Sequence, residues 1–153
     1  TSVNNFVIIL VSGPYHFAAG MNNKAVFYLL DCDEGSITQE YISTVKKLSI
    51  GANYAVALLS DGRLYIHIIE ANDVLEAERE SKLLPEKDEN EGKIVSADIK
   101  GEMLIYATSN GKIRYFLLDE WTEVNCFEHR APLKLSFPDQ AGTRLLIVDE
   151  HSR

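Results

Sequence analysis

The sequence predicts an all-β fold built from a repeated unit of short antiparallel strands. Three observations carry this prediction: a turn-plus-strand motif that occurs three times, a strand-like segment before each turn, and alternating apolar and polar residues further upstream. Four short strands that recur every ~40–50 residues are typical of modular β architectures rather than of one continuous sheet.

The recurring motif begins at a tight turn and aligns without gaps over residues 22–31, 61–70 and 110–119. Its turn pairs are Asn22-Asn23, Asp61-Gly62 and Asn110-Gly111. These residue types tolerate a positive φ and mark tight hairpins. Each motif continues with a basic residue, a β-rich run and two aliphatic residues, and each ends in an acid at the same offset. The common offset predicts a common structural unit.

The other strands of each unit are predicted from side-chain patterns upstream and downstream of the motif. Small Ala18, Ala19, Ala55 and Ala57 lie in the segments before the first two turns, as expected where neighbouring sheets approach closely. The expected second strands are Tyr15–Met21, Tyr54–Leu59 and Met103–Thr108; the expected first strands are Lys47–Ile50, Ile94–Ile99 and Leu133–Phe137; and the expected fourth strands are Glu40–Val45 and Trp121–Glu128.

The end of the third strand indicates which repeat architecture this is. Leu30-Asp31, Ile69-Glu70 and Leu118-Asp119 stand where WD repeats carry a Trp-Asp dipeptide, with an aliphatic residue in place of Trp. The apolar runs Phe27–Leu30 and Ile66–Ile69 suit strands that are buried on both faces. We therefore predict an incomplete WD40-type β-propeller of about three four-stranded antiparallel blades and part of a fourth. An ordinary β-sandwich with hairpins is the alternative.

The whole chain, residues 1–153, is expected to be a fragment of one propeller domain. Its blades are expected at roughly 1–45, 46–91 and 92–130, with a partial blade at 131–153. The chain begins with Thr1 rather than Met, and aligning Ser152 with Ser60 and Ser109 places its end inside a blade. Because rings usually close with 4–8 blades, the isolated piece is expected to expose blade faces and to self-associate, for instance as two half-rings.

One stretch departs from the repeat. Asn72–Leu84 begins with an N-cap candidate in Asn72 or Asp73 and ends before Pro85, which predicts a helical turn. The polar segment 86–92 that follows is interpreted as a solvated loop between blades, with an electrostatic contact to a basic partner as the alternative.

Composition excludes several classes of partner. The 15 basic residues are scattered among 23 acidic ones, and the net charge of −8 argues against a nucleic-acid or anionic membrane partner. The longest apolar run, Phe6–Val11, is far shorter than the ~18 residues of a membrane span, so direct insertion is not expected. Cys32 and Cys126 lack metal-ligand spacing, which favours two free thiols in a reducing compartment and leaves one bridge open.

No catalytic, cofactor-binding or metal-ligating residue is predicted. His16 and His67 are interpreted as core or strand histidines, and His129 and His151 have no ligand spacing that would form a zinc site. The run Asp149-Glu150-His151-Ser152 contains the residue types of a triad, but neighbours on a strand point to opposite faces. In an enzyme, polar side chains would have to meet at one mouth of the propeller ring. The candidates are His16, His67, Asp31, Glu70 and Asp119.

The large aromatic residues are interpreted as packing elements. Trp121 is expected to anchor the fourth strand of its unit, with a hot spot for a protein partner as the alternative. Tyr65, Tyr115 and Phe116 are expected in the blade core rather than in a ligand cage.

Several segments follow one another in a recognisable order along the chain: 15–25, 54–58, 76–85, 114–116, 137–145 and 148–150. Together they resemble the second β-propeller of the intraflagellar transport protein 144 family, also called WD repeat-containing protein 19. The resemblance covers nearly the whole chain, but 32–39 and 86–93 match poorly, so partner contacts in those two regions are not carried over.

The resemblance implies a non-catalytic scaffold subunit of intraflagellar transport complex A. Such a subunit would act in retrograde ciliary transport, cilium assembly and ciliary import of membrane receptors. It implies docking to other complex A subunits, adaptors or receptor cargo, and a location in the cilium or flagellum (axoneme and basal body) and cytoplasm. A propeller of a vesicle-coat subunit, which shares the propeller-plus-solenoid layout, is the alternative, and a propeller enzyme is a third.

Overall fold

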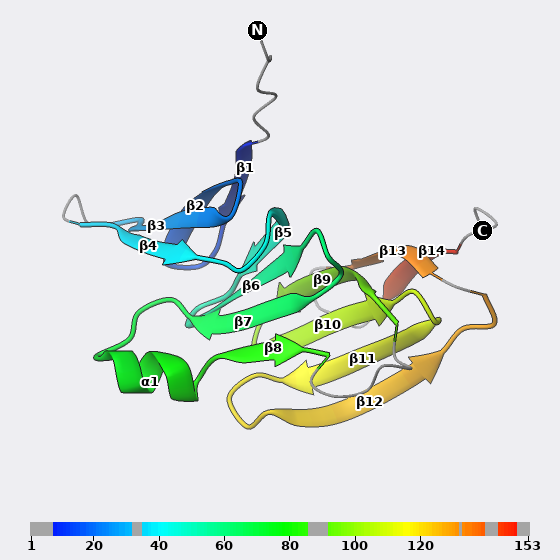
Figure 1. Cartoon of the computed structure of the whole chain (residues 1–153). Helices are drawn as coiled ribbons and strands as arrows, with labels where there is room; N and C mark the ends of the chain where they lie inside the picture. Colours follow the sequence, from blue (N-terminus) through cyan, green and yellow to red (C-terminus); the bar gives the residue numbers. More distant parts are fainter. Residues whose placement is uncertain (1–7, 32–34, 86–91, 132, 140–143, 150–153) are drawn as a thin grey trace, which may run out of the picture.

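The computed structural model describes residues 8–31, 35–85, 92–131, 133–139 and 144–149. These residues form three four-stranded sheets and one two-stranded sheet, and all strand pairing is antiparallel. The sheets follow one another side by side from the N-terminal to the C-terminal end of the chain (Figure 1). The predicted class, an incomplete β-propeller, is confirmed.

Within each sheet the strands pair in chain order. Sheet 1 consists of β1 (Ile8–Ser12), β2 (His16–Met21), β3 (Lys24–Leu29) and β4 (Ile37–Glu40); sheet 2 of β5 (Val45–Ile50), β6 (Tyr54–Leu59), β7 (Leu64–Ile68) and β8 (Lys82–Leu84); sheet 3 of β9 (Ile94–Lys100), β10 (Met103–Thr108), β11 (Lys112–Leu117) and β12 (Thr122–Glu128); and sheet 4 of β13 (Leu133–Pro138) and β14 (Leu145–Asp149). The predicted second and third strands are therefore confirmed, and β2 begins one residue late.

The three hairpin turns differ in length although their sequences align. Met21 pairs with Lys24, so the first loop holds two residues, with Asn22 at φ 56°. In sheet 2 the Leu59 N–H donates to the Arg63 carbonyl at 2.8 Å, which leaves a three-residue loop with a positive φ at Gly62. Three-residue loops place such a residue last, usually a glycine. The shorter first turn shifts β2 by one residue, so His16 is equivalent to Tyr54 and Met103.

The prediction of a fourth strand at Glu40–Val45 is wrong. The strand is β4, which ends at Glu40. Residues 41–44 then cross to the next sheet, and Tyr41 is buried there because its side chain packs on His67. Strand β4 is short and mostly exposed, so no alternation of apolar residues marks it. The other predicted fourth strand is confirmed as β12.

A short helix and an unpredicted strand connect β7 to segment 86–91, which lies outside the described residues. Helix α1 spans Val74–Arg79, and the Asp73 carboxylate caps it by accepting the Glu76 N–H at 2.7 Å. The Glu76 carboxylate in turn accepts the Asn72 N–H at 2.6 Å, a reciprocal cap. Strand β8 follows where only a helical turn was predicted. No helix in the described part of the chain has the length and hydrophobicity needed to cross a membrane.

The hydrophobic core consists of three layers, one between each pair of successive sheets. Ala18, Ala55 and Ala57 are fully buried between sheets 1 and 2, as predicted for a close approach. Among the described residues, sheet 2 packs on a sheet at each face and sheet 3 packs on sheet 2 and on the two-stranded sheet 4, whereas sheet 1 packs on sheet 2 alone. For this reason Ile66–Ile69 is largely buried, but Tyr28, Leu29 and Leu30 are 37–49% exposed.

Polar contacts join the first strands of sheets 2, 3 and 4, which are β5, β9 and β13. The Lys47 ammonium on β5 lies 2.8 Å from the Asp98 carboxylate on β9. The Ile99 N–H donates to the Ser49 hydroxyl at 2.9 Å, and the Ser96 hydroxyl donates to the Ser136 carbonyl at 3.0 Å. These contacts fix the lateral position of one sheet on the next.

We predict that G111A destabilises the fold more than G101A. Both glycines have a positive φ, which costs an alanine about 1–2 kcal/mol. A Cβ at Gly101 would meet nothing within 4 Å, whereas a Cβ at Gly111 would lie 2.5 Å from the His129 carbonyl oxygen. Urea denaturation of the two variants measures the difference. Equal losses in the free energy of unfolding would show that the close approach at Gly111 is absent.

Candidate functional site

Two grooves open at one edge of the row of sheets. At this edge lie the turns between the first and second strands of each sheet and the ends of the third strands. The first groove, between sheets 1 and 2, has a volume of about 270 Å³ and is lined by His16, Ala52, Asn53, Ile68–Glu70 and Glu76. The second, between sheets 2 and 3, combines cavities of about 50 and 210 Å³. It is lined by Gly51–Tyr54, Ile66, Arg79, Glu80, Lys82, Gly101, Glu102 and Leu118–Trp121.

The two grooves are repeats of each other. Each is bordered by a turn between first and second strands and by the acid of the WD-like dyad, Glu70 in the first groove and Asp119 in the second. The residue before each acid is held by an equivalent backbone bond: Ile69 N–H to Asn53 C=O at 2.8 Å and Leu118 N–H to Glu102 C=O at 3.0 Å. This bond brings the acid to the rim of the groove.

Of the five residues that an enzyme would require, His16 and Glu70 meet in the first groove, and the other three lie elsewhere. Glu70 and Asp119 border separate grooves, and Asp31 is exposed and lines neither. His67 lies in the core between sheets 1 and 2. The described residues contain no group of three or more His, Cys, Asp or Glu side chains that could hold a metal ion. The absence of catalytic and cofactor sites stays a prediction.

His16 links the two sheets at the first groove. It begins β2, is 6% exposed, and its Nε2 atom lies 3.2 Å from the Glu70 carboxylate of sheet 2. Glu70 itself is half exposed on the rim. The residue is therefore a buried strand histidine, as interpreted from the sequence, with one polar contact that crosses between sheets.

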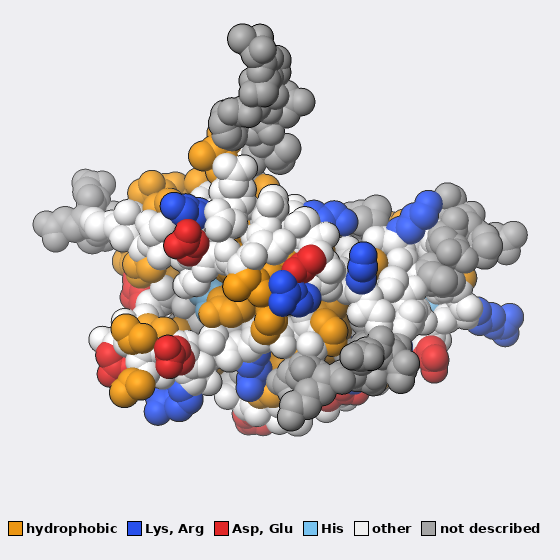
Figure 2. Space-filling model, in the orientation of Figure 1, with side chains coloured by type: hydrophobic (Ala, Val, Ile, Leu, Met, Phe, Trp, Pro, Cys, Tyr) orange, Lys and Arg blue, Asp and Glu red, His pale blue; other side chains and the backbone are white. Residues whose placement is uncertain are grey.

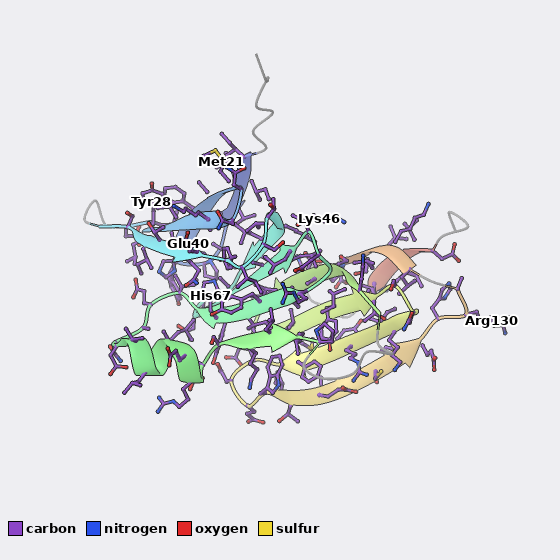
Figure 3. The ribbon with its side chains drawn as sticks, viewed as in Figure 1. Met21, Tyr28, Glu40, Lys46, His67 and Arg130 are labelled. Atoms are coloured by element: carbon purple, nitrogen blue, oxygen red, sulfur yellow. The ribbon has the colours of Figure 1, made fainter. Side chains whose placement is uncertain are left out.

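His67 is a structural histidine. Its Nδ1 atom is 2.9 Å from the Ile68 carbonyl and its Nε2 atom is 2.8 Å from the Tyr41 hydroxyl, so the neutral ring donates to the carbonyl and accepts from the phenol. Burial lowers the pKa of His67 to about 4. Burial and the neighbouring Tyr65 raise the pKa of Tyr41. Figure 3 shows His67 pointing from β7 toward sheet 1.

Trp121 forms the aromatic wall of the second groove. It stands at φ 48° immediately before β12, stacks on Phe116 with ring centroids 4.9 Å apart, and lies under the Lys82 ammonium at 5.0 Å. The predicted packing role of Trp121 is confirmed, while its role as a hot spot stays a prediction. Tyr54 lines the same groove, and burial, with smaller contributions from the charges of Glu80 and Asp119, raises its pKa.

His129 and Asp149 form another polar pair that the sequence did not predict. His129 Nε2 lies 3.1 Å from the Asp149 carboxylate and connects the loop before β13 to the end of β14. Asp149 thus contacts a distant histidine, and His151 of the triad-like run lies outside the described residues. Cys126 is an exposed free thiol on β12, and Cys32 also lies outside the described residues.

Comparison with known families agrees with this geometry. A family model described as the WDR19 second β-propeller matches residues 5–153. The chain belongs to the WDR19 second β-propeller family. It is 38% identical to WD repeat-containing protein 19 of Homo sapiens over 97% of this chain, and 40% identical to that of Mus musculus over 92%. WD repeat-containing protein dyf-2 of Caenorhabditis elegans is 34% identical over 72% of this chain.

This WDR19-type chain spans about a tenth of the length of these relatives, since it covers 11%, 10% and 8% of them. Among solved structures, Kluyveromyces lactis Hsv2 matches 92% of this chain with a TM-score of 0.64, over 45% of its own length and at 14% identity. The computationally designed Ika4 protein matches 99% of this chain with a TM-score of 0.65, over 91% of its own length and at 12% identity. At such low identity these likenesses show the fold alone.

The buried His67 predicts a loss of stability in acid. The unfolded chain takes up the proton near pH 6.5 and the folded chain only near pH 4. The free energy of unfolding should therefore fall as the pH drops through this window, by about 3 kcal/mol. H67Q should remove this part of the pH dependence, whereas Y41F should keep it because the imidazole still titrates. Urea denaturation across the window checks both variants; an unchanged pH dependence in H67Q would contradict the assignment.

Proposed function

We propose that this chain is a protein-docking module of an intraflagellar transport complex A scaffold, with no catalytic activity of its own. Membership of the WDR19 second β-propeller family carries the proposal. The proposed roles are retrograde ciliary transport, cilium assembly and ciliary import of membrane receptors. The proposed partners are other complex A subunits, adaptors or receptor cargo, and the proposed location is the cilium together with the cytoplasm.

The grooved edge is the docking surface in this proposal. Concave sites with aromatic and polar lining suit side chains of a protein partner, and the repeat provides two such sites next to each other. Acidic side chains predominate among the charged residues that line the grooves, which suits a partner with basic side chains and disfavours nucleic acid. These charged residues are the acidic Glu70, Glu76, Glu80, Glu102, Asp119 and Glu120 and the basic Arg79 and Lys82.

The domain organisation proposed from the sequence places all residues 1–153 in one propeller. The proposed blades are roughly 1–45, 46–91 and 92–130, with a partial blade at 131–153; the order of the strands along the chain supports this division, with Val45 as the first residue of β5. Sheets 1, 2 and 3 then contribute the edges of the two grooves that form the docking surface.

The proposal predicts that complex A subunits co-purify with the full-length protein through this segment. Tagged full-length protein from ciliated cells, with and without residues equivalent to 1–153, is affinity-purified and its partners are identified by mass spectrometry. The expected result is recovery of complex A subunits and loss of at least one of them on deletion. Recovery of vesicle-coat subunits, or of no stable partner, would contradict the proposal.

Matched charge reversals locate the contact without removing the segment. Glu102 and Glu120 are exposed at the grooves, so E102K/E120K should weaken the interaction that the deletion abolishes. E40K/E128K changes the net charge by the same amount at two exposed sites that line neither groove and should leave the interaction intact. Equal effects of the two variants would show that the contact does not use the grooved edge.

A further inference from the structure

Helix α1 belongs to an insertion in sheet 2 that the repeat does not require. The connection between the third and fourth strands spans residues 69–81 in sheet 2 but only 118–121 in sheet 3. Figure 1 shows α1 standing out from the sheet at the lower left, between the end of β7 and the start of β8. Because functional residues concentrate on connections that a rigid scaffold positions, α1 is a candidate for a role beyond stability.

Two apolar side chains on α1 face the solvent. Val74 is 72% exposed and Leu75 is 76% exposed, which makes Leu75 the most exposed large hydrophobic side chain in the described part of the chain. None of the six described residues of α1 is buried. Figure 2 shows hydrophobic side chains among acidic and basic ones over α1, at the lower left. The apolar pair therefore contributes no packing to its blade.

Local hydrogen bonds rather than apolar packing hold α1 in place. The cap formed by Asp73 and Glu76 fixes its first turn, and the Ser81 hydroxyl donates to the Glu78 carbonyl at 3.0 Å beyond its last turn. The helix consequently presents Val74 and Leu75 in a defined geometry without burying them, and substitution of either side chain should leave the fold intact.

Helix α1 is also the rim that the two grooves share. Glu76 lines the first groove, and Arg79 and Glu80 line the second. Since Leu75 directly precedes Glu76, the apolar pair lies at the border of the first groove. The pair and the groove are therefore parts of one continuous surface.

The first groove presents negative charge without a cationic side chain to balance it. Among the described residues its lining contains the carboxylates of Glu70 and Glu76 and no Lys or Arg. His16 Nε2 contacts the Glu70 carboxylate, while His16 Nδ1 is buried without a hydrogen-bond partner among the described residues. These contacts are satisfied by the uncharged tautomer with its proton on Nε2, which orients Glu70 without neutralising it. The groove of about 270 Å³ suits an ammonium or guanidinium group.

We propose that α1 and the first groove form one binding site for a protein segment in which an aliphatic side chain stands next to a Lys or Arg. The aliphatic side chain packs on Val74 and Leu75, and the cation enters the groove and meets Glu70. The acidic setting disfavours an anionic membrane as the occupant of the apolar pair. This inference rests on the function proposed above and names the chemistry of the partner at one part of the grooved edge.

Co-purification with the tagged full-length protein tests the site through two variants and two matched controls. L75S removes the apolar contact, and E70Q removes the charge but keeps a hydrogen-bond acceptor. Each should lower recovery of the subunit that the deletion abolishes by about ten-fold. I42S, at an exposed apolar residue that lines neither groove, and E78Q, at an exposed acid of α1 that lines neither groove, should behave like the wild type.

The outcomes separate this inference from the proposed function. If the wild type recovers complex A subunits, and L75S and E70Q recover them as the two controls do, the docking function stands and the site inference is overturned. If the wild type recovers none of these subunits, the proposed function fails and the inference fails with it.

Site-specific cross-linking identifies the occupant of the site. A photoreactive benzoylphenylalanine replaces Leu75 in the full-length protein, and the cross-linked peptide is sequenced by mass spectrometry. The expected peptide comes from a complex A subunit, adaptor or cargo protein and carries an aliphatic residue next to a Lys or Arg, and E70Q should lower its yield. A cross-link to lipid, to another segment of the same chain or to a second copy of it would overturn the inference.

Discussion

The structure depends on the packing of one face of each four-stranded sheet on the next sheet. No sheet buries enough apolar surface alone, and burial of that surface is the main stabilising contribution to a β fold of this kind. Small residues such as Ala18 and Ala57 let the sheets approach, and the large residues Phe27 and Leu48 fill the layer around them. Because the same positions are used in each repeat, the sheets follow one another in a regular row, and any sheet without a neighbour leaves an apolar face open.

The grooves follow from the same packing. The hydrophobic layers hold neighbouring sheets together along the length of their strands. At the ends of the strands the turns of two neighbouring sheets stand apart, and a groove lies between them. Repeat-equivalent backbone bonds place Glu70 and Asp119 at the rims of separate grooves rather than in one pocket. The proposed docking of a protein partner uses this repeated and mainly acidic surface.

The fold could be predicted where local sequence determines it, and the site could be predicted only in part. A turn pair followed by an apolar run is a local signal. It identified the second strands β2, β6 and β10 and the third strands β3, β7 and β11. The edge strands lack that pattern, since β4 is mostly exposed and β8 is only three residues long. The turn at Asn22-Asn23 is one residue shorter than its counterparts in sheets 2 and 3. This difference was missed because the third strands align without a gap. The residue that could have indicated it is Asn23, which stands where the other two turns have Gly62 and Gly111. The contact of His16 with Glu70 depends on how two sheets stack, which strand periodicity does not determine.

The central claim, that successive sheets join through repeat-equivalent faces, is tested most directly by nuclear Overhauser effects between sheets in the isotopically labelled chain. A Cβ at Gly20 would lie 2.9 Å from a Leu48 methyl group, and one at Gly51 would lie 2.9 Å from an Ile99 methyl group, so both glycines closely approach the next sheet. The account predicts strong effects from the Gly20 α protons to the Leu48 methyl and from the Gly51 α protons to the Ile99 methyl. Intact strand pairing without these two effects would contradict it.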